Sequence, residues 1–318
     1  METPEDNKKT DGWEREILEK VALAAIAEQT RARRWGIVFK TLTFLYLAAV
    51  LFAMSPNAKK DMGGSGKEHT AVIDIVGMIA EGKDVTADSV IKSLRAAVKD
   101  KNTKGIILHA NSPGGSPVQS HYIYTEIRNI KKQNPKLPIY AVVSDICASG
   151  CYYIASASDK IFVSPASLIG SIGVLMDGFG FVDTMKNIGI ERRLITAGTH
   201  KAMLDPFSPS KPEETAYIQG LINQVHGQFI TAVKEGRGNR LKETPDMFSG
   251  LVWTGEESIK NGIADAYGDD RTVAKDLIGA EKLEDFTQKE ELFDKLVGKM
   301  GAAFGHALSS SVQNTSFR

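Results

Sequence analysis

The sequence is poor in the residues that build disulfide frameworks and metal sites. Its 318 residues include only two cysteines and six histidines. The cysteines, Cys147 and Cys151, lie close together without a histidine pair at ligand spacing, which excludes the common zinc patterns. We expect both cysteines on one helix, where disulfide geometry is poor, and therefore predict two small buried side chains.

An excess of charge of either sign is also missing. Lysine and arginine total 39 residues, aspartate and glutamate total 39, and the formal net charge is zero. A broad nucleic-acid surface needs a basic excess or stripe, so we expect no nucleic-acid partner. Hydrophobic residues make up 42% and charged residues 25% of the chain, which is typical of a globular protein. The length allows one large domain with appendages or two small domains.

One long apolar run stands out from this composition. Residues 35–54 contain a single charge, Lys40, and about 20 such residues are needed to cross a bilayer core. A cleaved signal peptide fits poorly because many acidic residues precede the run, whereas a buried core helix stays open as an alternative. We predict a transmembrane anchor with a cytoplasmic N-terminus, because three basic residues stand directly before the run: Arg31, Arg33 and Arg34.

After residue 69 the predicted strands and helices alternate. This order favours an α/β fold with parallel strands. Apolar residues at helical spacing predict the helices, and short runs of β-branched residues predict the strands. The predicted strands are 70–76, 104–110, 139–145, 160–164 and 191–197, and the predicted helices are 87–99, 117–133, 147–157, 180–188 and 212–235.

Two of the predicted strand-to-helix turns carry residues suited to acyl chemistry. The segment 111–115 ends in Gly114 and Gly115, and paired glycines let backbone N–H groups approach an anion, although a plain turn explains them equally well. Ser149 lies in the tripeptide Ala-Ser-Gly before a predicted helix. A serine there serves either as a helix N-cap or as a nucleophile next to helix N–H groups.

A serine nucleophile needs a base, and Lys201 is a candidate because it follows the predicted strand 191–197. A lysine acts as a base only when burial disfavours its charged form. Other patterns fit less well: GxSxG is absent around Ser149, and the S-x-x-K matches at Ser89 and Ser208 have no KTG after them. A Ser-His-Asp triad stays open, with these candidate members: His109, His121, His200 and Asp205.

Taken together, these turns resemble one family. The order is a strand, the sequence NSPGG, the sequence ASG, and a lysine in a later H-K pair. It is similar to the bacterial signal peptide peptidase A group, serine peptidases of the ClpP/crotonase superfamily. The resemblance covers about residues 70–270 and includes the stretches 159–174, 198–207 and 251–268. It implies an α/β fold of repeated ββα units, preceded here by one transmembrane helix.

The resemblance also implies roles for particular residues. One departure is Cys151, which stands where the family commonly has a second glycine after the serine, and its larger side chain could narrow the adjacent pocket. The implied roles are Ser149 as nucleophile, Lys201 as general base, the backbone N–H groups of Gly115 and Gly150 as the oxyanion hole, Gly114 as support for that turn, and Ser171 as the hydroxyl that orients the lysine.

The implied protein is a membrane-anchored serine endopeptidase that degrades hydrophobic peptides such as cleaved signal peptides. The resemblance implies no metal and no organic cofactor, a homo-oligomer with sites that neighbouring subunits could share, and a bacterial inner-membrane location with the catalytic domain on the outer, periplasmic side. The expected organisation is a cytoplasmic segment (1–34), the anchor (35–54), a linker (55–69), the peptidase domain (70–275) and a C-terminal helical extension and tail (276–318).

Three other functions stay open at this point. A related inner-membrane protease could act on other substrates. A membrane scaffold could keep the fold without catalysis and would be indifferent to Ser149 and Lys201. A crotonase-type acyl-CoA enzyme would share the glycine turn but would use carboxylates for acid–base work.

Overall fold

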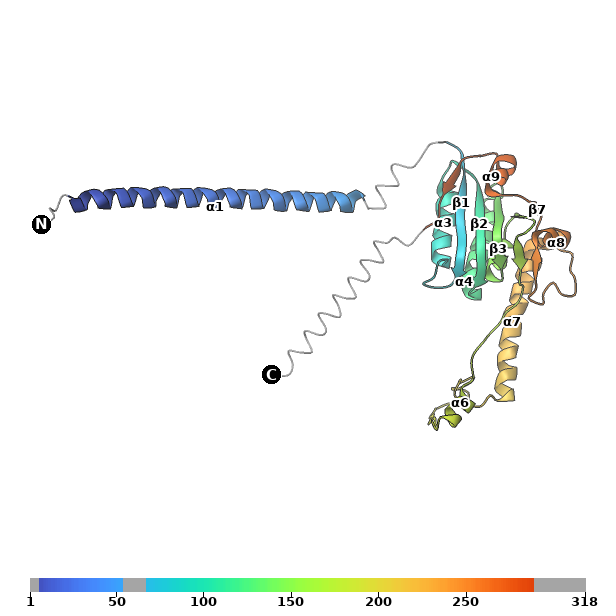
Figure 1. Ribbon diagram of the computed structural model, residues 1–318. Coiled ribbons are helices and arrows are strands. Elements are labelled where there is room, and N and C mark those ends of the chain that lie inside the picture. The colour runs from blue at the N-terminus through green and yellow to red at the C-terminus, as the bar shows by residue number, and fades with distance from the viewer. Residues whose placement is uncertain (1–5, 54–66, 289–318) are drawn as a thin grey trace. The chain divides into compact units, whose positions relative to one another are not determined.

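The computed structural model describes residues 6–53 and 67–288. The chain divides after Gly66 into two compact units, which Figure 1 colours from blue to red along the sequence. The first unit contains one helix, α1 (Asp6–Ala53), and the second contains all the other described elements. The predicted C-terminal extension lies outside the described residues from residue 289 onward.

Helix α1 joins two segments that the sequence suggested separately, the N-terminal segment and the apolar run. It runs through both without a break, since no proline interrupts residues 6–53. None of the helices in the described residues combines the length and the apolar character that a membrane crossing requires. Residue 54, the last of the predicted anchor, and linker residues 55–66 lie outside the described ranges.

The second unit is built on one mixed sheet, so the predicted α/β class is confirmed. Within residues 67–288 the sheet has eight strands in the order β6-β5-β3-β2-β1-β8, with β4 paired to β3 and to β7. All pairs are parallel except β5 with β6. The strands are β1 (His69–Ile79), β2 (Thr103–Gly115), β3 (Ile139–Ala148), β4 (Lys160–Val163), β5 (Leu168–Gly170), β6 (Val252–Thr254), β7 (Ala266–Tyr267) and β8 (Leu283–Asp285).

Helices cover both faces of the sheet. On one face, α3, α4, α5 and the C-terminal part of α7 bury the main core against β1, β2 and β3. On the other face, the smaller core of Ile107, Val142 and Phe162 packs against η2. The helices are α3 (Ala87–Lys99), α4 (Pro117–Gln133), α5 (Gly150–Ala155), α6 (Val182–Asn187), α7 (Pro212–Arg237), η1 (Gly238–Arg240), α8 (Gly255–Lys260), α9 (Asp270–Thr272) and η2 (Val273–Ile278).

Helices α3 and α4 begin and end where the apolar spacing predicts. Ser116 caps α4 by accepting a hydrogen bond from the N–H of Gln119, and Pro117 fits the first helical position because no donor is needed there. Three strands are longer than predicted, because β1, β2 and β3 continue through the segments 77–79, 111–115 and 146–148. The prediction of a strand at residues 191–197 is wrong, since the structure has no strand in this segment.

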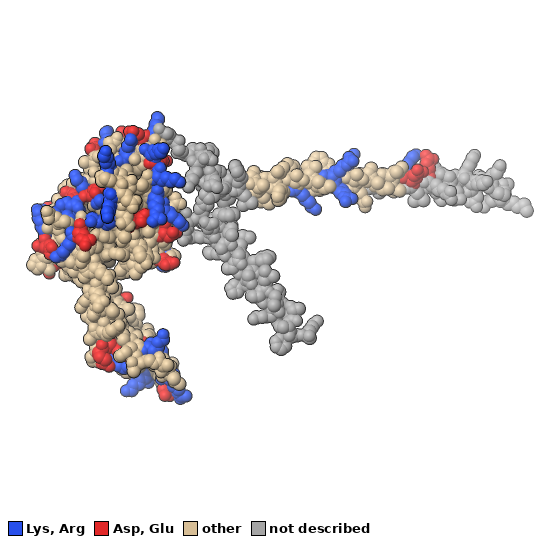
Figure 2. Space-filling model, turned by 180° about the vertical axis from the view of Figure 1, so that it is seen from behind, with Lys and Arg blue, Asp and Glu red and all other residues tan. Residues whose placement is uncertain are grey.

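A projecting segment, here called the arm, comprises residues 175–222. It contains α6 and the N-terminal half of α7, and Figure 1 shows α6 beside the end of α7 that points away from the sheet. Figure 2 shows charges of both signs mixed over the main unit, whereas much of the arm is uncharged until its far end. Large apolar side chains are exposed along it: Leu175, Met176, Phe179, Ile188, Ile195 and Tyr217.

Candidate active site

Ser149 occupies the turn between β3 and α5. Its φ of 52° and ψ of −121° are rare for a residue with a side chain. Ser149 stands at the N-cap position of α5, yet its side chain makes no capping hydrogen bond. A capping serine would accept one from the first helical turn. The half-buried hydroxyl has no hydrogen-bond partner among the described residues, which favours the nucleophile over the N-cap interpretation.

The glycines at the end of β2 lie directly against this turn. A methyl group on Gly114 would lie 2.6 Å from the Ala148 carbonyl oxygen and 2.8 Å from the Gly150 nitrogen, so only glycine permits the contact. A methyl group on Gly150 would lie 3.2 Å from the Gly115 nitrogen. Gly150 begins α5, so its N–H has no partner within that helix. Two backbone donors beside a serine hydroxyl form an arrangement that could hold an oxyanion.

Ser171 directly follows β5, the strand that pairs with the end of β3 before Ser149. The N–H of Ser149 donates to the carbonyl of Gly170 at 2.8 Å, and Ser171 follows directly with a φ of 53°. The Ser171 N–H donates to the carbonyl of Leu251 at 2.7 Å, which fixes its backbone. Its hydroxyl has no hydrogen-bond partner among the described residues. The backbone of Ser171 thus follows directly after the residue that is hydrogen-bonded to the candidate nucleophile.

Lys201 lies elsewhere, in the turns of the arm, and its side chain is exposed. Its neighbours in sequence line an open hollow of about 1380 Å³ together with Ile218 of α7. Helix α5, which follows Ser149, contacts α7 nearer the C-terminal end of α7. There Tyr153 stacks on Phe229 with ring centroids 4.9 Å apart. Eleven residues separate these two positions, about 16 Å along a helix axis. No hydrogen bond or ion pair of the described residues joins Lys201 to Ser149.

The sequence-predicted site residues therefore fall into two groups. The structure brings one group together at the carboxyl ends of β2, β3 and β5. Within a single protomer, the predicted base stays apart from this group. The gathered residues are Gly114, Gly115, Ser149, Gly150 and Ser171.

None of the three candidate histidines contacts Ser149. His109 Nδ1 donates to Asp270 Oδ2 at 2.7 Å, and its Nε2 lies 3.4 Å from Ser144 Oγ. This hydrogen bond raises the pKa of His109 above its ordinary value. His121 Nδ1 lies 3.0 Å from the hydroxyl of Tyr153, and burial raises the pKa of that tyrosine to about 12. His200 is exposed and lies in the arm. A histidine triad built on Ser149 is not formed.

The two cysteines do not behave as the sequence predicts. Cys147 and Cys151 form a disulfide, with their Cα atoms 5.1 Å apart. The prediction placed both on one helix, but β3 continues to Ala148 and α5 begins only at Gly150. The chain turns sharply between them, so their side chains meet. Both are buried as predicted.

The disulfide could be predicted only if the last residue of β3 was known. The sequence contains a weak signal for where this strand ends. The residues between Asp145 and Ser149 are apolar and continue the strand without a proline or glycine. A strand read through Cys147 would have placed the cysteines on either side of a turn. Elsewhere in the described part of the chain, no three His, Cys, Asp or Glu side chains are placed to hold a metal ion.

Two family models match this chain. Residues 131–284 match Peptidase family S49, and residues 69–169 match Clp protease. Both matches contain Ser149 and Gly150. Gly115 lies only in the Clp protease match, and Lys201 lies only in the S49 match.

Three curated relatives differ in how much of their length the chain covers. A protein of Enterococcus faecium, provisionally named signal peptide peptidase SppA, is 31% identical over 197 residues, which are 62% of this chain and 57% of that protein. Protease 4 of Salmonella typhi is 30% identical over 267 residues, 81% of this chain and 41% of that protein. The Na(+)/H(+) antiporter NhaA of Brucella abortus is 43% identical over 186 residues, 58% of this chain and 25% of that protein.

The chain thus spans between a quarter and less than two thirds of these relatives. Three quarters of the antiporter lies outside the match, so its name describes much that this chain does not share. The S49 match, the Clp protease match and the peptidase relatives all point to a peptidase. This agrees with the position of Ser149 on the turn after β3, where a nucleophile could lie. The chain is therefore similar, over its matched residues, to Peptidase family S49 and to serine peptidases of the signal peptide peptidase A group.

Proposed function

We propose that this protein is a serine endopeptidase that cleaves hydrophobic peptides, with Ser149 as its nucleophile. The observation that carries the proposal is the Ser149 turn. The hydroxyl makes no capping hydrogen bond, the backbone has a positive φ, and the Gly114–Gly115 segment packs against Ser149 and Gly150. Nucleophilic serines of other hydrolases sit on similarly strained strand-to-helix turns.

The proposed base is Lys201, supplied by a neighbouring copy of the chain. Two observations support this: the separation of Lys201 from Ser149 within one protomer, and the exposed apolar side chains of the arm. Large exposed apolar patches mark surfaces that are covered by a partner. A subunit interface would also exclude water, and a lysine needs such an environment to act as a base.

In the proposed reaction, the neutral lysine takes the proton of the Ser149 hydroxyl while Oγ attacks the peptide carbonyl carbon. The negative oxygen is held by the N–H groups of Gly115 and Gly150. The protonated lysine then donates its proton to the leaving amine, and an ester joins the acyl group to the serine. Water, deprotonated by the same lysine, hydrolyses that ester and restores both side chains. Ser171, close to Ser149, would orient the lysine.

The proposed substrates are extended apolar peptides such as signal peptides left in a membrane. The support is the family, together with the apolar residues 35–54, which we propose as the membrane anchor of a bacterial inner-membrane protein. The buried disulfide supports an outward-facing catalytic domain, since disulfides persist in oxidising compartments. A related membrane protease with other substrates, or a scaffold without catalysis, would leave a different experimental signature.

The test is cleavage of a synthetic signal peptide by the full chain in detergent. Ser149→Ala should reduce kcat at least about 1000-fold, as expected for loss of a nucleophile. The matched control is Ser144→Ala, which removes the serine that contacts His109 and should keep activity. Loss of activity in Ser144→Ala alone would move the nucleophile to the His109 cluster. An inactive, folded and assembled parent would favour the scaffold.

A further inference from the structure

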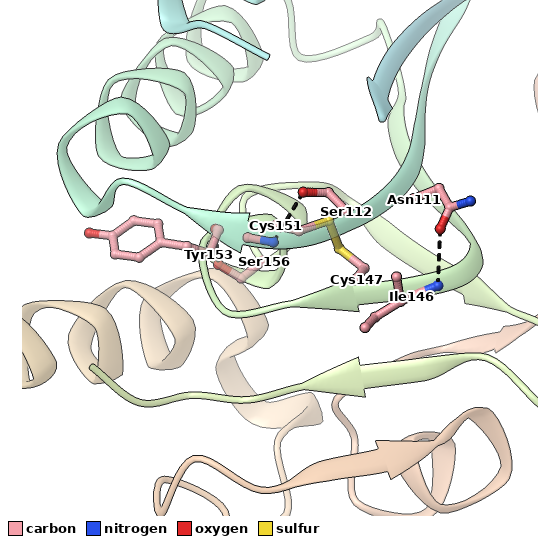
Figure 3. Close-up of a disulfide and its surroundings, with 8 residues drawn as sticks. Asn111, Ser112, Ile146, Cys147, Cys151, Tyr153 and Ser156 are labelled. Carbon is pink, nitrogen blue, oxygen red and sulfur yellow. Dashed lines mark hydrogen bonds between the residues drawn. A yellow bond between two sulfur atoms is a disulfide. The ribbon is translucent and has the colours of Figure 1, made fainter. Parts of the chain in front are cut away.

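The Cys147–Cys151 disulfide brackets the candidate nucleophile. Cys147 lies near the end of β3 and Cys151 is the second residue of α5, so Ser149 is midway between them. Figure 3 shows the bond joining the end of β3 to the start of α5. Both cysteines are almost completely buried. The bond therefore ties the strand that leads into the turn to the helix that leads out of it.

The turn needs such a constraint. A residue with a side chain avoids positive φ, and conformations of this kind persist only when the surrounding structure enforces them. Two hydrogen bonds already act on the backbone of Ser149: its N–H donates to Gly170, and its carbonyl accepts from the N–H of Tyr153 at 2.9 Å. The disulfide adds a covalent constraint across the same residue.

At this placement the bond contributes less to global stability than a bond that closes a long loop. The stabilisation that a disulfide provides through the unfolded chain grows with the length of the closed loop. Here the two cysteines are separated by four positions in sequence, near the lower limit. A bond at this position restricts local geometry more than it restricts the unfolded chain.

The disulfide also contacts the segment that forms the glycine turn. Ser112 lies opposite Cys147 in the register of β2 with β3, and it is fully buried. Its hydroxyl accepts a hydrogen bond from the N–H of Gly114 at 3.1 Å, which Figure 3 shows next to the disulfide. The bond therefore packs against both parts of the candidate site: the turn that contains Ser149 and the segment that contains Gly114 and Gly115.

We propose that the Cys147–Cys151 disulfide is a positioning element that holds Ser149 in its reactive conformation, so that the oxidised protein is the active peptidase. This proposal rests on the peptidase function proposed above. A dithiol reductant would convert the bond to two cysteine thiols and would itself become a disulfide, with two electrons transferred. Reduction would lower turnover while the domain stays folded. Because the sulfurs are buried, this reduction requires local opening of the turn.

The test compares the full-length parent with the double variant Cys147→Ala, Cys151→Ala. The expected result is a 10- to 100-fold lower kcat (an order-of-magnitude estimate for a displaced reacting group), with little change in KM and an unfolding temperature close to that of the parent. Ser156→Ala, another small buried change next to α5, serves as the control and should keep the parental kcat. Dithiothreitol should lower the kcat of the parent reversibly and leave the double variant unaffected.

The other outcomes separate the two proposals. Equal kcat in the parent and the double variant would overturn the positioning role while leaving the peptidase intact. Alkylation of the unreduced, denatured parent at both cysteines would show free thiols and would also overturn it. If the double variant does not fold, the dithiothreitol arm on the parent decides. If the folded, assembled parent cleaves nothing, the peptidase proposal fails, and the positioning role fails with it.

Discussion

At the scale of single residues, Gly114 is a position in the site that only glycine can occupy, because it lies directly against the Ser149 turn. Its φ is 100°, and any Cβ would collide with the carbonyl oxygen of Ala148 and with the nitrogen of Gly150. We predict that Gly114→Ala separates the glycine turn from the nucleophile turn and lowers kcat by about 10²–10³, the effect of losing one oxyanion donor. Peptide-cleavage kinetics on the folded variant check this prediction.

A glycine-to-alanine control is available on α7. A Cβ on Gly227 would meet nothing within 4 Å, and the residue is exposed in a helix, where alanine is preferred. Gly227→Ala should therefore keep the parental kcat. Parental kcat in Gly114→Ala would show that the two turns do not need this contact.

His109 makes the stability of the fold depend on pH. Its hydrogen bond to Asp270 raises its pKa in the folded state, with a further contribution from Asp74 on β1. A raised pKa stabilises the fold fully below the unfolded value of about 6.5, and this contribution is lost as pH rises through the folded pKa. Urea unfolding at about pH 5.5 and pH 8.5 should show a larger loss of stability for the parent than for His109→Gln. Equal pH dependence in the two proteins would contradict the prediction.

The residue scale also shows where the sequence was sufficient. Ser149 and the two glycines, Gly114 and Gly115, could be proposed from their motifs, and the structure brings them together although β2 and β3 run farther into these motifs than predicted. The disulfide could not, since it depends on β3 ending at Ala148 rather than near Asp145. A shift of three residues changed two cysteines on one helix into partners across a turn.

At the scale of elements, the helices followed their sequence pattern more closely than the strands. The apolar spacing and the N-cap define α3 and α4 within their own residues. A strand is defined by its neighbours, because β-propensity largely reflects packing against adjacent strands. Segment 191–197 contains the β-branched residues Ile195 and Thr196, yet it lies in the arm and forms no strand.

Helix α7 is anchored to the sheet by a buried ion pair. The Arg237 guanidinium donates two hydrogen bonds to Asp265, at 2.8 and 3.0 Å, and a third to the Gly262 carbonyl. Burial by itself would raise the pKa of Asp265, but Arg237 outweighs it and holds that pKa below its ordinary value. The arm projects from this helix, so the anchor fixes the direction of the arm.

We predict that Arg237→Ala destabilises the domain by about 3–5 kcal/mol, because it leaves the Asp265 carboxylate partly buried without its main partner. Arg193→Ala is the control: its pair with Glu191 is exposed on both sides and should matter by less than about 0.5 kcal/mol. Chemical denaturation measures both. A loss below about 1 kcal/mol in Arg237→Ala would mean that neighbouring Arg240 replaces it.

At the scale of the whole molecule, one protomer brings the proposed nucleophile and the paired glycines together but holds the proposed base apart from them. Ser149 lies at the strand ends of the sheet, whereas Lys201 lies on an arm with exposed apolar side chains. Sequence spacing could not reveal this separation, because 52 positions between two residues leave their distance undetermined. Assembly of several copies would cover the arm and complete each site from two chains.

The most direct test of this account is a mixture of two inactive proteins, Ser149→Ala and Lys201→Ala, unfolded together in equal amounts and refolded. If each site takes its serine from one copy and its lysine from the next, random assembly of a closed oligomer restores about a quarter of the parental activity. Each variant refolded alone should stay inactive. A mixture with no activity, from variants that assemble as the parent does, would contradict shared sites and would require the serine and the lysine to meet within one chain.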